Sequence, residues 1–254
     1  MEEFYIALIL TLIAGLSTTI GSLIALFIKK PNQKFITFIM GFSAGVMILI
    51  SFVELLQQGI ESTSFLLGHI FFFVGMGLMF LIDIAISHQY EFEKPILNDK
   101  IENSDIKLQK TSLLVTLGIM IHNIPEGMAT FVGTLKSIEL GILLAIAIAL
   151  HNIPEGIAVS VPIYTSTGNR KKAFFWSFLS GISEFIGALV FGLIFFSFIN
   201  DFLIGVMLAI VGGFMVYISL DELLPASRSL GSEHLPILGI IVGMVIMALS
   251  LSIL

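Results

Sequence analysis

The sequence contains no cysteine and few charged residues. Without cysteine, disulfides and thiolate metal ligands are excluded. Only 12% of the 254 residues are charged, against roughly 25% in soluble globular proteins, so a water-soluble domain is excluded as well. The 18 acidic residues outnumber the 12 basic ones. This balance removes the broad basic surface that nucleic-acid binding requires, and we expect no nucleic-acid partner.

Long apolar stretches with few or no charges make up most of the chain. A helix needs about 20 apolar residues to cross the hydrocarbon core of a bilayer, and eight stretches reach that length. Their residues do not alternate in polarity as the strands of a membrane β-barrel would. The sequence therefore predicts an all-α polytopic membrane protein whose single transmembrane domain covers residues 1–254, with the lipid bilayer as a partner. The expected helices are residues 4–28, 35–58, 65–87, 111–135, 138–164, 173–199, 202–224 and 235–254.

The positions of lysine and arginine predict the orientation. Eleven of the 12 basic residues fall in alternate connections, and Lys136 alone lies on the other side. Because basic connections remain in the cytoplasm, both termini are predicted to lie outside. The longest connection, residues 88–110, mixes acidic and basic residues and is expected to be a polar, flexible cytoplasmic loop. The four basic connections are residues 29–34, 94–110 and 170–172, and Arg228.

Several acidic residues nevertheless lie within the apolar stretches. Since lysine and arginine are confined to the connections, none is available to neutralise them. A charge near the centre of a bilayer costs at least about 2.5 to 3.5 kcal/mol, so these carboxyl groups are either protonated or completed by a bound cation. They are Glu54, Asp83, Glu126, Glu155 and Glu184, with Asp221 and Glu222 near the end of one stretch.

One six-residue string, His-Asn-Ile-Pro-Glu-Gly, occurs twice, at residues 122–127 and 151–156. Side chains three and four residues apart share one face of a helix, so the polar side chains of each copy converge. Each proline removes a backbone hydrogen bond and should bend its helix, which a membrane tolerates only where the backbone is buried in protein or lines a cavity. The converging sets are His122, Asn123 and Glu126 in one copy and His151, Asn152 and Glu155 in the other.

These side chains have the chemistry of a metal site. Imidazole, carboxylate and amide oxygen without sulfur suit divalent zinc, iron, cobalt and manganese, whereas magnesium and calcium sites avoid histidine. Glu184, near the middle of another expected helix, adds a third carboxylate. The set can form one well-filled site or two sites that share carboxylates. A purely structural role remains open for a single intramembrane histidine or glutamate, but the duplication argues against it here.

On these residues the chain resembles the ZIP (Zrt/Irt-like) family of divalent metal transporters, most closely a bacterial branch. The string on helix two, Gly41–Gly45 followed by Ser51–Glu54, adds to the likeness. The resemblance implies a 3+2+3 arrangement in the bacterial inner membrane, with helices one to three and six to eight packed as inverted repeats around the central pair. It also implies two adjacent metal sites. The primary site would use His122, Glu126, His151 and Glu155, and the second would use Asn123, Asn152 and Glu184 together with the shared Glu126 and Glu155.

Two features depart from the family's pattern. The long cytoplasmic loop is often rich in histidine, but here it holds only His88, which puts a metal sensor in the loop in doubt. Some members carry aspartate at the position of Asn152, so the second site is less acidic here.

The remaining acidic residues suggest a path for ions. Glu54, near the outer end of its stretch, is predicted either to admit cations or to be an interfacial glutamate that reaches water. Asp83, Asp221 and Glu222 lie near inner helix ends and are predicted to form an exit relay. Separately, two glycine pairs, Gly41 with Gly45 and Gly239 with Gly243, have the spacing of close helix packing, which is compatible with a homodimer.

The sequence thus predicts a transporter that imports divalent transition metals, zinc foremost and also iron, manganese, cobalt and cadmium, as its substrate. No organic cofactor is expected. The alternative from another class is an intramembrane zinc hydrolase, in which a metal activates water. Against it stand the lack of a His-Glu-x-x-His pair and a glutamate-rich lining that leaves no open coordination position.

Overall fold

The structure, a computed structural model, describes residues 2–27, 33–86, 101–229 and 234–253. Within these residues the chain is helical apart from short connections and contains no strand. The all-α prediction is therefore confirmed. The elements are α1 (Glu2–Phe27), α2 (Gln33–Ile50), the π-helical turn η1 (Ser51–Leu55), α3 (Leu56–Ser62), α4 (Phe65–Ile86), α5 (Ile101–Lys136), α6 (Ile138–Thr167), α7 (Arg170–Phe195), the short 3-10 turn η3 (Phe196–Phe198), α8 (Asp201–Ile218), the π-helical turn η4 (Ser219–Leu223), α9 (Leu224–Ser229) and α10 (Leu235–Ile253).

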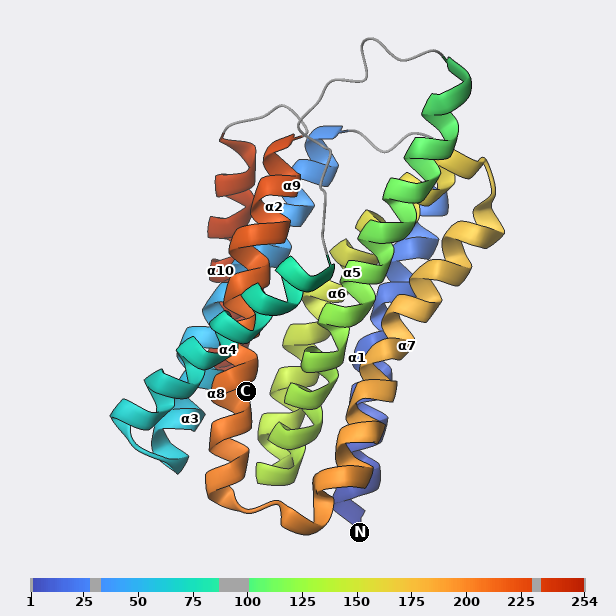
Figure 1. Cartoon of the computed structure of the whole chain (residues 1–254). Coiled ribbons are helices and arrows are strands. Elements are labelled where there is room, and N and C mark those ends of the chain that lie inside the picture. Colours follow the sequence, from blue (N-terminus) through green and yellow to red (C-terminus); the bar gives the residue numbers. More distant parts are fainter. Residues whose placement is uncertain (1, 28–32, 87–100, 230–233, 254) are drawn as a thin grey trace.

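Seven helical segments in the described part of the chain are long and apolar enough to cross a membrane. Three of them combine several elements: one contains α2, η1 and α3, another contains α7 and η3, and the third contains α8, η4 and α9. Helix α5 is not among the seven, although it runs beside α6 through the middle of the bundle (Figure 1). The polytopic helical class is thus confirmed, while the count of eight spans, the single domain and the outer location of both termini stay predictions.

The start of α5 differs from the sequence prediction. The loop was expected to extend from residue 88 to residue 110, but α5 begins at Ile101, so the prediction is wrong for the last ten residues. Residues 88–100 lie outside the described part of the chain. The physical reason is that the apolar stretch marks only the part of a helix that can lie in lipid, and a helix can continue beyond it as a polar helix in water.

Small and hydroxylated residues form the buried face of α1, and many large apolar residues elsewhere in the bundle face outward. Every buried residue of α1 is alanine, glycine, serine or threonine. In contrast, Phe73, Leu81 and Leu193 are more than half exposed. This distribution is the one expected in lipid, where the outer surface needs no polar groups and small residues allow helices to approach closely.

The helices pack in two groups, each of four long helices. One group contains α1, α5, α6 and α7, and in the other α2 pairs with α10 while α4 pairs with α8 (Figure 1). Contacts between α2 and α6 and between α5 and α8 join the groups. The helix contacts are symmetric. If α1, α2 and α4 are matched in order with α7, α8 and α10, and α5 is matched with α6, the main contacts of one half correspond to those of the other. This is the pattern that inverted repeats around a central pair would give.

The predicted glycine pairs lie within one chain at the contact of α2 with α10. A Cβ built on Gly41 or Gly45 would collide with backbone carbonyl oxygens of α10, and one on Gly239 or Gly243 would collide with those of α2. The close-packing spacing is therefore used inside the chain. It gives no support to a homodimer.

Candidate metal centre

The short connection between α5 and α6 brings the two copies of the repeated string to one depth. Ser137 alone separates the helices, and its side-chain oxygen caps α6 by accepting a hydrogen bond from the backbone N–H of Leu140 at 3.1 Å. His122 lies 14 residues before the end of α5, and His151 lies 13 residues after the start of α6. Since the helices are antiparallel neighbours, both copies meet near the middle of the bundle.

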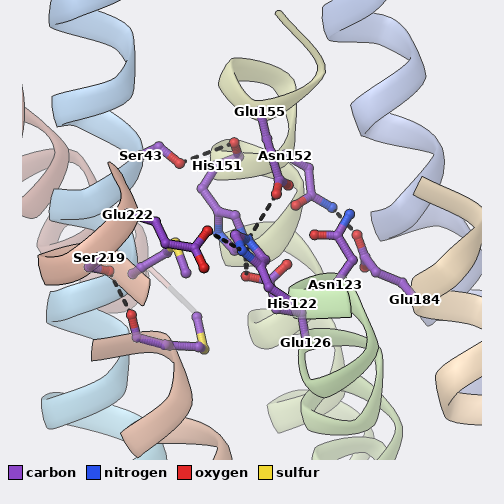
Figure 2. Close-up of polar contacts among 12 residues, drawn as sticks. Ser43, His122, Asn123, Glu126, His151, Asn152, Glu155, Glu184, Ser219 and Glu222 are labelled. Atoms are coloured by element: carbon purple, nitrogen blue, oxygen red, sulfur yellow. Dashed lines mark hydrogen bonds and ion pairs between the residues drawn. The ribbon is translucent and has the colours of Figure 1, made fainter. Parts of the chain in front are cut away.

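The histidine of each copy contacts the glutamate of the other copy. His122 Nε2 lies 2.8 Å from Glu155 Oε1, and His151 Nε2 lies 3.0 Å from Glu126 Oε1 (Figure 2). His122 Nε2 is also 3.8 Å from Glu126 Oε1. One ligand atom from each of His122, Glu126 and Glu155 lies within 4.8 Å of the others, which is close enough for these three side chains to hold one metal ion.

Glu222, in the turn η4 that follows α8, also lies at this cluster. Its Oε2 lies 3.7 Å from Nδ1 of His122, and the side chain is buried in η4 (Figure 2). The sequence placed Glu222 with Asp221 near an inner helix end, but here the two neighbouring acids lie in different surroundings. Glu222 thus lies against His122, and its predicted part in an exit relay stays a prediction. Helical periodicity could not predict the contact between Glu222 and His122. The π-helical turn at Ser219 changes the direction of the residues that follow, and the sequence pattern does not indicate such a turn.

The two asparagines connect the cluster to α1 and α7. Asn123 Nδ2 donates to the backbone oxygen of Ser180 at 3.0 Å and to its hydroxyl at 3.2 Å. Asn152 Nδ2 donates to the backbone oxygen of Ala14 at 3.0 Å and to Oε1 of Glu184 (Figure 2). With their nitrogen atoms occupied in this way, both amides keep their oxygen atoms available as acceptors. The structure thus brings Asn123, Asn152 and Glu184 together beside the histidine cluster.

A set of buried lone-pair atoms has no hydrogen-bond donor in the described part of the chain. In that same part, the ion pairs of these carboxylates are with the two histidines. Buried polar atoms are normally hydrogen-bonded, and an unsatisfied carboxylate oxygen in a low-dielectric interior is costly. Each atom in the set is of a kind that can ligate a divalent cation, and three of these residues, His122, Glu126 and Glu155, offer ligand atoms close enough together for one ion. The set comprises Asn123 Oδ1, Asn152 Oδ1, Glu126 Oε2, Glu155 Oε2, Glu184 Oε2 and Glu222 Oε1, with Nδ1 of His122 and of His151.

The glycines that end the two strings allow the neighbouring helices to reach the site. A Cβ on Gly127 would collide with the backbone of Glu184 in α7, and a Cβ on Gly156 would collide with the carbonyl group of Thr18 in α1. The site is therefore enclosed by α1 and α7 at distances that only glycine permits.

Glu54 lies apart from this cluster. It accepts a hydrogen bond from Nε2 of Gln58 at 2.9 Å, and with Gln58, Ser137 and Glu139 it lines a cavity of about 330 Å³ next to the start of α6. The cavity is at the end of the bundle that holds the connection between α5 and α6. Glu54 therefore borders a cavity near the connection between α5 and α6, and both of its predicted roles, admitting cations and reaching water at the interface, stay predictions.

Asp83 and Asp221 are brought together by a tyrosine. The hydroxyl group of Tyr217 donates to Oδ2 of Asp221 at 3.1 Å and lies 3.4 Å from Oδ2 of Asp83. These carboxylates come from α4 and η4, and Tyr217 comes from α8. The sequence grouped the two acids in an exit relay, which stays a prediction, and it did not identify Tyr217 as the residue between them.

These features define a class of protein: a multi-pass helical membrane protein with a buried polar centre on facing helices. The sequence profile described as "ZIP Zinc transporter" matches residues 87–251. Relatives named "Zinc transporter ZupT" are 47% identical in Clostridium perfringens, 48% in Oceanobacillus iheyensis and 43% in Campylobacter jejuni. The alignments cover 99%, 99% and 100% of this chain and 96%, 98% and 98% of those relatives.

The chain therefore belongs to the ZIP family, and the resemblance inferred from the repeated string is confirmed. Members of this family are transporters of the cell membrane and not enzymes. The location of the chain as a multi-pass protein of the bacterial cell membrane follows from the family together with the seven apolar segments. The alternative of an intramembrane hydrolase has no support from these relatives.

Proposed function

We propose that the chain imports zinc into the cytoplasm through the centre formed by the two copies of the repeated string. The observation that carries the proposal is the buried cluster of His122, Glu126 and Glu155, whose ligand atoms lie close enough together to hold one metal ion, with further unsatisfied polar atoms around it. The name of the relatives, zinc transporter, supports zinc as the substrate. Divalent iron, manganese, cobalt and cadmium are further candidate substrates, since nitrogen and oxygen ligands accept several such ions.

The proposed primary site contains His122, Glu126, His151 and Glu155. An arriving ion would exchange water for imidazole and carboxylate ligands, replacing the two contacts between histidine and glutamate that hold α5 and α6 together. Because each contact links the two helices, an ion bound there would bridge them in the same way. The site could therefore bind and release the ion while α5 and α6 stay in contact.

The proposed second site lies beside the first. Asn123, Asn152 and Glu184 would supply oxygen ligands, and Glu126 and Glu155 would be shared. Its amide ligands carry no charge, so an ion there would be held less firmly than in an all-carboxylate site. Such a site suits an ion in transit.

The proposed path begins at the cavity next to Glu54 and ends beside Asp83 and Asp221. With both termini outside, the cavity would face the exterior, and the acids joined by Tyr217 would face the cytoplasm. Glu222 would lie between the primary site and this inner pair. The path thus offers carboxylates at each stage, which lowers the cost of moving a dication through a low-dielectric region.

Zinc uptake into proteoliposomes that contain a fluorescent zinc reporter tests this function. The wild-type chain should raise the signal above that of empty vesicles, and Glu155→Gln should lose at least about 90% of the rate, since charged and hydrogen-bonded metal-site partners each matter about 10-fold or more. Glu3→Gln, which changes an exposed glutamate at the start of α1, is the matched control. Wild-type uptake no faster than empty vesicles, or an unchanged rate in Glu155→Gln, would contradict the proposal.

A further inference from the structure

A second internal repeat joins α2 to α8. Residues 45–56 and 213–224 share the pattern Gly-x-Met-x-x-Ile-Ser-x-x-Glu-Leu-Leu, with seven of 12 positions identical at a shift of 168 residues. The two acidic residues at equivalent positions are Glu54 and Glu222. This repeat is distinct from the His-Asn-Ile-Pro-Glu-Gly string and lies on different helices.

Both copies fold into the same unusual turn. The α-helix changes to a π-helix at Ser51 in one copy and at Ser219 in the other. In each, the serine hydroxyl donates at 2.7 Å to the carbonyl oxygen four residues earlier, that of Met47 or Met215. Each turn then closes with a backbone N–H that donates to the serine carbonyl oxygen five residues earlier.

Each turn also packs against the helix that carries the other copy of the repeat. Turn η1 packs against α8, and turn η4 packs against α2. Gly45 in the first copy contacts α10, while Gly213 in the second contacts α4. The turns are therefore equivalent elements of the two halves of the bundle and not two unrelated irregularities.

The two acids differ in burial and in what they face. Glu222 is 5% exposed and lies against His122 of α5 at 3.7 Å. Glu54 is half-buried and faces the cavity at the start of α6. The two copies of the histidine string lie on α5 and α6. Glu222 lies beside the histidine of the α5 copy, whereas Glu54 lies beside the start of α6, away from the histidine of the α6 copy.

A π-helical turn inserts one extra residue, which rotates the residues after it by about 100° relative to a regular α-helix. The glutamate comes three residues after the serine, so the turn decides which side of the helix carries the carboxylate. A hydroxyl group bonded to the carbonyl four residues earlier locally loosens the helical ladder. Loss of that hydroxyl would favour a regular helix and point the glutamate elsewhere.

We propose that Ser51 and Ser219 are positioning residues that hold these two turns open, so that Glu54 and Glu222 form equivalent acidic stations on the metal path. Ser219 directs Glu222 to the histidine cluster, and Ser51 directs Glu54 to the cavity. This proposal rests on the proposed transport function for its kinetic part. Its equilibrium part, the metal affinity of the cluster, does not depend on transport.

The first test compares Ser219→Ala, Glu222→Gln and the double variant in purified protein, with zinc affinity measured by competition against a chelating dye. Each single variant should weaken affinity by about 10-fold, and the double variant should be no weaker than either one, because both changes remove the same carboxylate from His122. Ser51→Ala and Glu54→Gln should leave this affinity unchanged. In vesicles they should raise the zinc concentration for half-maximal uptake, again without adding to one another.

Ser160→Ala is the matched control. Ser160 is buried and its hydroxyl donates at 2.7 Å to the carbonyl oxygen four residues earlier, but it lies in the regular α-helix α6. It should retain wild-type affinity and uptake. If Ser219→Ala does not fold, the isosteric pair Ser219→Thr and Ser219→Val replaces it, and only the variant that keeps the hydroxyl should retain affinity.

Three outcomes would overturn the proposal. They are affinity losses of Ser219→Ala and Glu222→Gln that multiply in the double variant, equal affinities of the Ser219→Thr and Ser219→Val variants, and an affinity loss in Ser160→Ala as large as in Ser219→Ala. Absence of uptake by the wild-type chain would instead overturn the transport function. In that case the affinity measurements at Ser219 would still decide the role of the turn.

Discussion

His122 of α5 contacts Glu155 of α6 at 2.8 Å, and the reciprocal pair, His151 and Glu126, lies at 3.0 Å. Neither copy of the repeated string is therefore self-contained, although its own histidine and glutamate are four residues apart. Each copy supplies an imidazole to the carboxylate of the other. Removing one side chain should consequently affect partners on both helices.

Glu126→Gln should weaken zinc binding more than Glu184→Gln. Glu126 contacts both His122 and His151, whereas Glu184 contacts Asn152 beside the main cluster. Calorimetric titration of the purified variants with zinc should show an affinity loss of about 10-fold or more for Glu126→Gln. A larger loss in Glu184→Gln would mean that the asparagine side of the centre is the tighter site.

His122→Ala should also lower zinc affinity by at least about 10-fold. The substitution removes a candidate ligand and leaves Glu155 without its imidazole partner. Titration of the variant with zinc provides the measurement. His69→Ala is a suitable control, because His69 lies on α4, where its Nδ1 is 2.7 Å from the carbonyl oxygen of Phe65. Equal affinities in the two variants would remove His122 from the site.

Gly127→Ala should destabilise the bundle. A Cβ at this position collides with the backbone of Glu184, so α5 and α7 must separate, and overpacking of this kind costs about 1–3 kcal/mol. The thermal unfolding temperature in detergent should fall. Gly77→Ala in α4 meets nothing within 4 Å and should leave the temperature unchanged or raise it, since alanine favours a helix by roughly 0.5–1 kcal/mol over glycine. A similar shift in both variants would contradict the packing argument.

Tyr217→Phe should reduce the maximal rate of zinc uptake without changing zinc affinity at the histidine cluster. The substitution removes the hydroxyl that bridges Asp83 and Asp221 and leaves two neighbouring carboxylates without their shared donor. Without the shared hydroxyl the two carboxylates should lose their common position, and ions should pass them more slowly. Initial rates over a range of zinc concentrations give the measurement, with Tyr164→Phe as the control. A rate equal to wild type would exclude a role for this bridge.

The cluster formed by the repeated string could be predicted from the sequence, because its residues are close together in the chain. Residues three or four apart on a helix share a face whatever the rest of the protein does, and the short connection at Ser137 fixes two antiparallel helices. The participation of Glu222 could not be predicted in this way. Its contact with His122 depends on a turn 97 residues later in the chain, at Ser219, and on the packing of α8 against α5.

The extent of α5 was missed for a different reason. Apolar content marks the part of a helix that lipid can surround, and Ile101 to Lys110 form a helix without being apolar. The glycine pairs of α2 and α10 show a further limit, because the same spacing serves contacts within one chain or between two.

The sequence by itself determined that this is a helical membrane protein with a duplicated set of imidazole, amide and carboxylate groups, because apolar length and helical spacing are properties of contiguous residues. Only the tertiary structure decided that each histidine serves the other helix's glutamate, that Glu222 joins them and that Tyr217 joins Asp83 to Asp221. These contacts unite residues far apart in the chain, and packing between helices, which no local pattern encodes, sets them.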